Sequence, residues 1–438
     1  MATSRLTLGG RGLQYGRPMQ AVGGHLAPMA PAYDDGCVTA LVPALMQGDQ
    51  APGGWPPWLP DEVLGARRTL LLVLDGLGWE QLRSRPGAAP NLTGFAGGAI
   101  TTVAPSTTAA ALTSIATGEP PGRHGLVGYR IAVGAPERPA QAEVLNALRW
   151  STGDGDARRR HDPREFQPCE VFGSQWPPVV TREAFSDSGF TAAHLSDTRL
   201  MGYRDRAGLV ARVVEAFAGG EPFVYAYWDD IDRTAHEFGL ADRYEEELAA
   251  CDAMVGELAE RLPAGTAIVV TADHGLVHVG ENLVHLPPSV TTLVDGQSGE
   301  ARFRWLHARA GAMGDLAAAA HAAFDEVAWV RTADEVIGAG WFGPVVSAAA
   351  RARLGDVAVA TNPFELFLDF GLRMKTQSKA QQTFIVQLTG SAGWYLPTIK
   401  AAAGGGYSAI IQSNLVGPEG GNVLVNRTVE LINAMWAK

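Results

Sequence analysis

The chain has 438 residues, of which 46% are hydrophobic and 18% are charged, and its formal net charge is -11 at pH 7. This length is enough for a large core in one or two domains. The acidic balance and the lack of a basic block argue against binding to a nucleic-acid scaffold. A small anionic substrate remains compatible with this charge, because a metal site can reverse the local field.

Cysteine content and the lengths of the apolar runs indicate the compartment. The three cysteines are isolated, which fits neither a disulfide framework nor a thiolate metal site and favours a reducing environment: Cys37, Cys169 and Cys251. The first residues contain no apolar segment typical of a signal peptide, and no apolar run reaches about 18 residues. We therefore expect a cytoplasmic protein without a membrane span.

The first part of the chain is predicted to lead into a buried strand. Residues 1–60 are rich in Gly, Pro and Ala, so we expect an irregular arm. An apolar run follows at residues 69–74 and ends at Asp75, which is typical of a buried parallel strand whose last carboxylate emerges at the carboxyl end. A short helix is expected from Trp79 to Leu82.

The next segment combines a Pro-bounded turn, three hydroxyl side chains and a small-residue stretch with helical spacing, ended by Gly118. The hydroxyl side chains are those of Ser106, Thr107 and Thr108. A hydroxyl at a helix start lies among unpaired N–H groups at the positive end of the helix dipole, which suits an attacking oxygen and an incoming phosphate. The alternative is an ordinary N-cap, a role that Ser and Thr often take.

Two further strands are predicted to end in acidic residues. Residues 131–185 are charged and rich in Pro, and look like an insertion that could cover a site. An aromatic strand at 221–228 runs into a group of aspartates, and an amphipathic helix is expected at 243–262. A third buried strand, at 267–273, ends at Asp273. This alternation predicts an α/β fold with a mostly parallel central sheet flanked by helices.

Three strand-end acids make a metal site the main hypothesis. In open α/β sheets the loops at the carboxyl ends of the strands meet at one edge, where ligands bind. His236 follows Asp232 by one helical turn, and His274 comes directly after Asp273. Carboxylates with imidazoles suit Zn²⁺ or a similar ion, which could activate a threonine hydroxyl. The alternatives are turn or cap residues for each Asp and a surface-helix histidine for His236.

Four motifs in this order resemble the alkaline phosphatase superfamily, and most of all its nucleotide pyrophosphatase/phosphodiesterase branch. The motifs are VLDGLG (73–78), PSTTAAALTSIATG (105–118), DIDRTAHEFG (230–239) and TADHG (271–275). The resemblance spans roughly residues 65–360 and implies an alkaline phosphatase-like fold with two divalent metal ions, Zn²⁺ being the expected metal. By this resemblance one ion would be held by Asp75, Thr108, Asp273 and His274, and the other by Asp232 and His236.

The same resemblance implies a mechanism and a substrate class. Thr108 would attack phosphorus and form a phosphothreonine ester that water then hydrolyses. Tyr129 and Arg130 stand where the phosphodiesterase branch has an Asn, and we expect them to bind phosphate oxygens. The expected activity is that of a phosphodiesterase acting on a small phosphorylated substrate such as a nucleotide.

Catalytic impairment is the alternative. The family completes its second metal site with a histidine in a C-terminal HG motif, and no such motif follows residues 340–360. Without that ligand the second ion would bind weakly. The chain would then be a phosphate-binding or interaction protein.

The last part of the chain differs in character. Residues 361–438 resemble the C-terminal part of the neutral/alkaline ceramidase-related family, in which the Glu of an NPFE-like motif, here Glu365, helps to complete a zinc amidase site. The histidine motifs of that family are missing, so we expect an atypical α/β segment without ceramidase activity. The expected domains are an arm (1–60), a phosphodiesterase domain (61–360) and this segment (361–438).

Overall fold

The computed structural model describes residues 21–22, 25–26, 30–134, 143–277, 284–325 and 327–361. The residues described between 30 and 277 and between 286 and 361 belong to one compact unit. The antiparallel pair β1 (Ala21–Val22) and β2 (His25–Leu26) belongs to a second unit. The ceramidase-like segment, with Glu365, lies outside the described residues, which end at Thr361.

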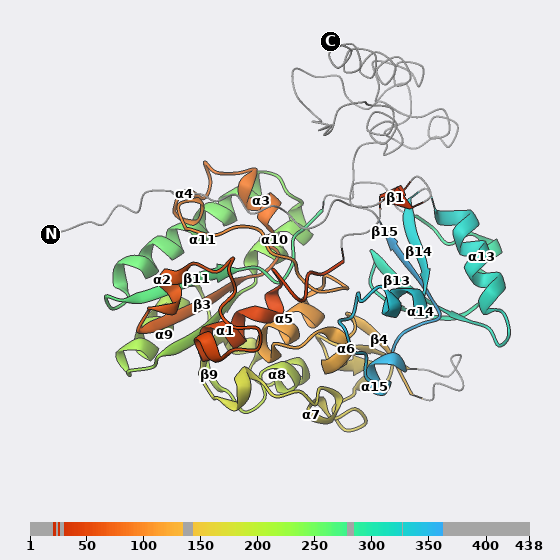
Figure 1. The fold of residues 1–438 in the computed structure, drawn as a ribbon, viewed down its shortest axis with the longest axis horizontal. Coiled ribbons are helices and arrows are strands. Elements are labelled where there is room, and N and C mark those ends of the chain that lie inside the picture. Colours follow the sequence, from red (N-terminus) through yellow and green to blue (C-terminus); the bar gives the residue numbers. More distant parts are fainter. Residues whose placement is uncertain are drawn as a thin grey trace, which may run out of the picture. The chain divides into compact units, whose positions relative to one another are not determined.

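A parallel sheet forms the centre of the larger unit (Figure 1). In the described part of the chain it has five strands in the order β11-β3-β10-β8-β9. Their bounds are β3 Arg68–Leu74, β8 Pro178–Arg182, β9 Arg199–Tyr203, β10 Phe223–Trp228 and β11 Thr266–Thr271. All neighbouring strands are parallel, so the prediction of a mostly parallel α/β sheet is confirmed.

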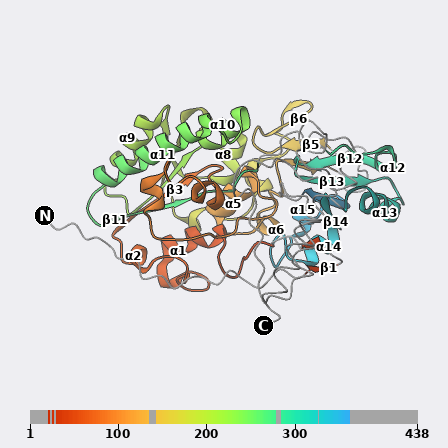
Figure 2. The same ribbon diagram turned by 90° about the horizontal axis from the view of Figure 1, so that it is seen from above.

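Both faces of the sheet are buried, because alternate residues of its strands enter two different apolar clusters. On β3, Leu71 and Val73 join the first cluster, while Leu70, Leu72 and Leu74 join the second. Helices cover the two faces, as Figure 2 shows. They are α1 (Leu41–Gln47) and α5 (Thr108–Thr117) on the first face, and α9 (Arg206–Ala218) and α11 (Asp242–Arg261) on the second.

The strand register brings three strand ends together. Trp228 at the end of β10 pairs with Leu74 at the end of β3, and Thr271 at the end of β11 pairs with Val73. Since β3 lies between β10 and β11, the residues that follow all three strands emerge side by side. They lead into α3 (Trp79–Arg83) after β3 and α10 (Asp230–Phe238) after β10.

Two expectations about this sheet need correction. Residues 267–273 were expected to be a buried strand, but β11 lies at the edge of the sheet and only Val269 in it is buried, since it has one neighbouring strand instead of two. Residues 131–185 were expected to be an insertion, yet 178–182 form β8 of the central sheet. Only the earlier part forms a separate antiparallel sheet, β4 (Arg130–Val133), β5 (Glu143–Asn146), β6 (Ser151–Thr152) and β7 (Gly155–Asp156).

A second antiparallel sheet, in the order β12-β13-β15-β14, follows in sequence. Its strands are β12 (Val294–Gly299), β13 (Phe303–Ala308), β14 (Ala328–Thr332) and β15 (Val357–Thr361). The helices of this region are α12 (Pro288–Thr291), α13 (Met313–Phe324), α14 (Ala333–Gly338) and α15 (Ala348–Arg351). No helix in the described ranges is long and apolar enough to span a membrane.

Short helices also precede and follow the strands of the central sheet. The segment expected to be an irregular arm contains η1 (Val38–Ala40), α1 and η2 (Gly48–Gln50), and Val38 and Leu41 pack into the core there. The remaining short helices are α2 (Asp61–Leu64), α4 (Pro90–Thr93), α6 (Pro121–His124), α7 (Pro163–Phe166), η4 (Phe172–Ser174), η5 (Glu183–Phe185) and α8 (Gly189–His194).

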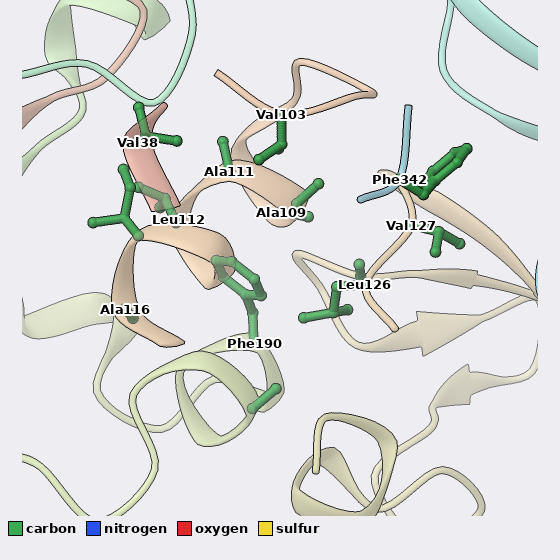
Figure 3. Packing of buried hydrophobic residues seen from close by; sticks show 14 of the residues in the cluster. Val38, Val103, Ala109, Ala111, Leu112, Ala116, Leu126, Val127, Phe190 and Phe342 are labelled. Atoms are coloured by element: carbon green, nitrogen blue, oxygen red, sulfur yellow. The ribbon is translucent and has the colours of Figure 1, made fainter. Parts of the chain in front are cut away.

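Helix α5 lies deep in the first apolar cluster. Every residue from 109 to 116 is buried, and Figure 3 shows apolar side chains from separate segments around the helix. Small side chains allow this close approach on all sides of the helix. The helix ends at Gly118, whose φ of 72° is left-handed, as the sequence predicts. Its first residue, Thr108, is therefore held by a tightly packed element.

The packing of α5 is open to a direct test. Replacing buried Leu112 by Ala should lower the free energy of unfolding by about 2–5 kcal/mol, because a cavity is left in the core. Leu64→Ala, at a side chain that is 39% exposed, should cost less than about 1 kcal/mol. Guanidinium denaturation of both variants measures the difference. Equal losses would mean that α5 is not a central element of the core.

Candidate active site

Asp75 follows β3, and its two carboxylate oxygens lie in different environments. Its backbone N–H donates to the Trp228 carbonyl oxygen at 2.9 Å and so continues the β3–β10 pairing. Its Oδ2 accepts a hydrogen bond from the hydroxyl of Tyr227, a buried residue of β10. Its Oδ1 is also buried and has no hydrogen-bond partner in the part of the chain that the structure describes.

Asp273 follows β11 and repeats this arrangement. Its Oδ1 accepts the backbone N–H groups of Gly76 at 3.1 Å and of His274 at 2.9 Å. The Thr102 hydroxyl donates to its carbonyl oxygen. Its Oδ2 is buried and unpartnered among the described residues. Each aspartate therefore has one oxygen fixed by hydrogen bonds and one left free.

His274 directs a ring nitrogen at both free oxygens. Its Nδ1 lies 3.1 Å from the Gly275 carbonyl oxygen, which assigns the proton of a neutral ring to Nδ1 and leaves a lone pair on Nε2. Nε2 lies 3.5 Å from Asp75 Oδ1 and 3.4 Å from Asp273 Oδ2. Three acceptor atoms thus converge, and neither carboxylate oxygen has a donor among the described residues, an arrangement that a cation stabilises.

Asp232 reaches the same place from α10. The ligand atoms of Asp75, Asp232 and His274 lie within 4.8 Å of one another, and Asp232 Oδ1 has no partner among the described residues. Its close approach depends on Gly76, whose φ is 73°, because a Cβ there would lie 2.9 Å from Asp232 Oδ1. His236 Nε2 lies 3.5 Å from Asp232 Oδ2, and its side chain is 73% exposed.

The clustered acids strongly influence one another. Burial raises the pKa of Asp75 well above its usual range, and the carboxyl groups of Asp273 and Asp232 raise it further. Burial also raises the pKa of Asp232, while His274 and His236 act in the opposite direction. Burial and the nearby Asp75 keep the pKa of Tyr227 high, so its hydroxyl stays protonated and donates.

These donors fit a divalent metal ion. Buried, unpartnered carboxylate oxygens and an imidazole nitrogen form the oxygen and nitrogen set that Zn²⁺ and similar ions prefer. Asp75, Asp273 and Thr108 each place an oxygen within 3.5 Å of His274 Nε2, so the four residues of the first predicted ligand set lie together. The second predicted set, Asp232 and His236, is divided. Among the described residues, Asp232 forms a group of potential metal ligands with Asp75 and His274, and His236 is not part of that group.

Of the three candidate hydroxyl groups, the structure places that of Thr108 at this position. Thr108 Oγ1 lies 3.1 Å from His274 Nε2, while Ser106 is exposed. Thr107 is the N-cap residue of α5, but its side chain makes no capping hydrogen bond. Among the described residues, no N-cap side chain therefore covers the first N–H groups of α5 beside the Thr108 hydroxyl.

The predicted substrate-binding pair lies at the start of β4. The Tyr129 N–H donates to Glu300 Oε2 at 3.0 Å, and its hydroxyl accepts a hydrogen bond from Asn146 Nδ2 at 2.7 Å. Arg130 is exposed. Glu300 is a site neighbour that sequence reasoning missed, as are Tyr227 and Thr102, because each lies outside the four motifs and meets the site only through the fold.

Comparisons with known proteins identify the family. A family model described as Type I phosphodiesterase / nucleotide pyrophosphatase matches residues 69–334, which is more than half of the chain. The chain belongs to this family, and membership of the family suggests a metal-dependent phosphodiesterase-type hydrolase. The match ends before the C-terminal segment, so the ceramidase resemblance is not shown. No curated protein matches the chain.

Solved structures support the fold. Murine ectonucleotide pyrophosphatase/phosphodiesterase 5, as an inactive variant in complex with AMP, is 14% identical with a TM-score of 0.50, over 68% of this chain and 79% of that chain. The human protein of the same name is 14% identical with a TM-score of 0.44, over 67% of this chain and 78% of that chain. At this identity, the murine match shows a shared α/β fold.

The hydrogen bond from Tyr227 to Asp75 should matter for metal binding. Tyr227→Phe removes the donor that fixes the Asp75 carboxylate, so affinity for Zn²⁺ should fall about 10- to 100-fold. Tyr225→Phe is the matched control on the same strand, because its buried hydroxyl has no partner among the described residues. Zn²⁺ titration against a competing chelator measures both. Equal losses in the two variants would contradict the ligand role of Asp75.

The raised pKa of Asp75 predicts the pH dependence of the metal-free protein. Its folded-state pKa exceeds the unfolded value of about 4, so the folded state binds more protons and its stability falls as pH rises from about 4. Asp75→Asn should therefore stabilise the chelator-treated protein at pH 7 and change its stability little at pH 4. Denaturation at both pH values checks this, and a loss of stability at pH 7 would contradict it.

Proposed function

We propose that this protein is a metal-dependent phosphoric-ester hydrolase of the phosphodiesterase/nucleotide pyrophosphatase type, with Thr108 as its nucleophile. One observation carries the proposal. The Thr108 hydroxyl lies 3.1 Å from His274 Nε2, which itself faces the free oxygens of two buried aspartates. This arrangement places a hydroxyl where a bound cation would favour its ionised form.

The predicted ligands would hold two divalent ions, Zn²⁺ being the metal that suits their donor atoms. Asp75, Thr108, Asp273 and His274 form one set, and Asp232 with His236 the other. When bound, the ions supply positive charge that lowers the pKa of the threonine hydroxyl and balances the charge of the phosphoryl oxygens.

Different side chains and backbone groups of the chain have separate roles in the proposed reaction. Thr108 Oγ1 forms a bond to phosphorus while the bond from phosphorus to the leaving oxygen breaks. The open N–H groups of the first turn of α5 face the phosphoryl oxygens. Tyr129 and Arg130 bind the remaining oxygens, Arg130 through charge-assisted hydrogen bonds. Water then forms a bond to phosphorus, the bond from phosphorus to Thr108 Oγ1 breaks, and a proton from that water restores the threonine hydroxyl.

A nucleotide ester is the substrate class that the family suggests. The murine relative was solved in complex with AMP, a product that a nucleotide phosphodiesterase releases. The exposed Arg130, which follows Tyr129 at the start of β4, is a suitable partner for the phosphates of such a substrate.

Impaired catalysis is the second candidate, and one observation favours it. His236 is 73% exposed, and among the described residues no further His, Cys, Asp or Glu joins it and Asp232 in a group of three. An ion held by two side chains would bind weakly. Metal content near one ion per chain without turnover would support a phosphate-binding protein.

Hydrolysis of bis-p-nitrophenyl phosphate and p-nitrophenyl phosphate, with and without added Zn²⁺, tests the proposed function. Thr108→Ala should lower kcat at least about 1,000-fold, and Thr108→Ser should keep part of the activity because it retains a hydroxyl. Thr117→Ala, at the other end of α5, is the control and should keep wild-type activity. Mass spectrometry of acid-quenched enzyme should detect a p-nitrophenyl phosphoryl group on Thr108 with the diester and a phosphoryl group with the monoester. Full activity of Thr108→Ala would disprove the proposal.

A further inference from the structure

Gln81 lies on α3 and binds the segment that follows β11 with both ends of its side-chain amide. Its Oε1 accepts the Leu276 N–H at 3.3 Å, and its Nε2 donates to the Leu276 carbonyl oxygen at 2.8 Å. A backbone N–H only donates and a carbonyl oxygen only accepts, so these partners fix which end of the amide faces which group. The two bonds join parts of the chain that lie 195 positions apart in sequence.

The start of α3 and the segment after β11 are also in direct backbone contact. A Cβ at Gly78 would lie 2.5 Å from Gly275 Cα, closer than a Cβ comes to other atoms, so this approach requires a glycine at position 78. The Gly78 N–H donates to the Gly76 carbonyl oxygen at 3.0 Å, and the Gly78 carbonyl oxygen accepts the Leu82 N–H at 3.1 Å. The turn after β3 therefore holds α3, and with it Gln81, against this segment.

One peptide group connects Gln81 to the imidazole ring of His274. The Leu276 N–H and the Gly275 carbonyl belong to the same peptide group, which is planar, so the direction of one determines the direction of the other. The Gly275 carbonyl oxygen lies 3.1 Å from His274 Nδ1. By accepting the Leu276 N–H, Gln81 therefore also fixes the direction of the oxygen that faces the imidazole ring.

We propose that Gln81 is a positioning residue that orients the His274 imidazole through the peptide group between Gly275 and Leu276. With Nδ1 at the Gly275 carbonyl oxygen, Nε2 lies 3.1 Å from Thr108 Oγ1. This inference rests on the proposed function, in which His274 binds a metal ion beside Thr108. A histidine ligand usually donates its second ring N–H to a carbonyl or carboxylate, and the groups that fix this bond contribute to metal affinity without contacting the ion.

Zn²⁺ titration of the full chain against a competing chelator tests this role. Gln81→Met keeps the length of the side chain but removes both hydrogen bonds, so affinity for Zn²⁺ should fall about tenfold, the lower end of the range for partners of ligating histidines. Gln81→Glu still accepts the Leu276 N–H but sets a second oxygen against the Leu276 carbonyl oxygen, so its affinity should lie between those of wild type and Gln81→Met. Glu80→Met, at the exposed neighbouring position of α3, is the matched control and should bind Zn²⁺ as wild type does.

The visible absorption of Co²⁺, bound in place of Zn²⁺, distinguishes the orientation of a ligand from a general loss of stability. The spectrum of Co²⁺ depends on the type and geometry of its ligands. At saturating Co²⁺, the spectrum of Gln81→Met should differ from the spectra of wild type and Glu80→Met. A residue that only stabilises the fold would leave the spectrum of the bound ion unchanged.

Several outcomes would overturn the inference. Wild-type affinity or an unchanged Co²⁺ spectrum in Gln81→Met would do so, as would a Gln81→Glu protein that binds Zn²⁺ as weakly as Gln81→Met. Thermal unfolding identifies variants that fail to fold, in which case Gln81→Asn, whose amide is one methylene shorter, replaces Gln81→Met with the same expectation. A wild-type chain that binds no Zn²⁺ would overturn the proposed function together with this inference. The expected pattern of metal binding without any ester hydrolysis would contradict the proposed function alone.

Discussion

The site depends on buried carboxylate oxygens that have no hydrogen-bond donor in the part of the chain that the structure describes. Burying an ionised carboxylate without a partner is costly, and here three such oxygens lie near one imidazole lone pair. The raised pKa of Asp75 expresses this cost in the metal-free protein. The sheet on both sides of β3 must therefore be stable enough to hold these groups together until a cation offsets their repulsion.

The surrounding structure fixes each aspartate at one oxygen only. Tyr227 does this for Asp75, and the backbone N–H groups of Gly76 and His274 do it for Asp273. These donors belong to the strands and loops of the sheet, so the register of β10 and β11 on β3 sets the direction of the free oxygens. Preorganisation of this kind orients ligands before a metal binds.

Much of this arrangement could be predicted from sequence, because it follows from local patterns. Apolar runs that end at Asp75 and Asp273 indicate parallel strands, and parallel strand ends share an edge of the sheet. What could not be predicted depends on contacts between distant segments. Tyr227 looks like another core aromatic until its strand is paired with β3, and Glu300 meets Tyr129 across 171 positions of sequence. The edge position of β11 and the strand β8 likewise depend on the order of strands, which composition does not encode.

Helix α5 shows how stability and chemistry are separated within one element. Its residues from 109 to 116 are buried, so the helix is stabilised by packing and does not need a side-chain cap. An N-cap bond contributes about 1 kcal/mol, which a well-packed helix can forgo. The missing side-chain cap at Thr107 thus removes little stability, while it leaves the positive end of the helix uncapped beside Thr108. A helix with a weaker core contact would need its cap, and the phosphate oxygens would then compete with a side chain for the same N–H groups.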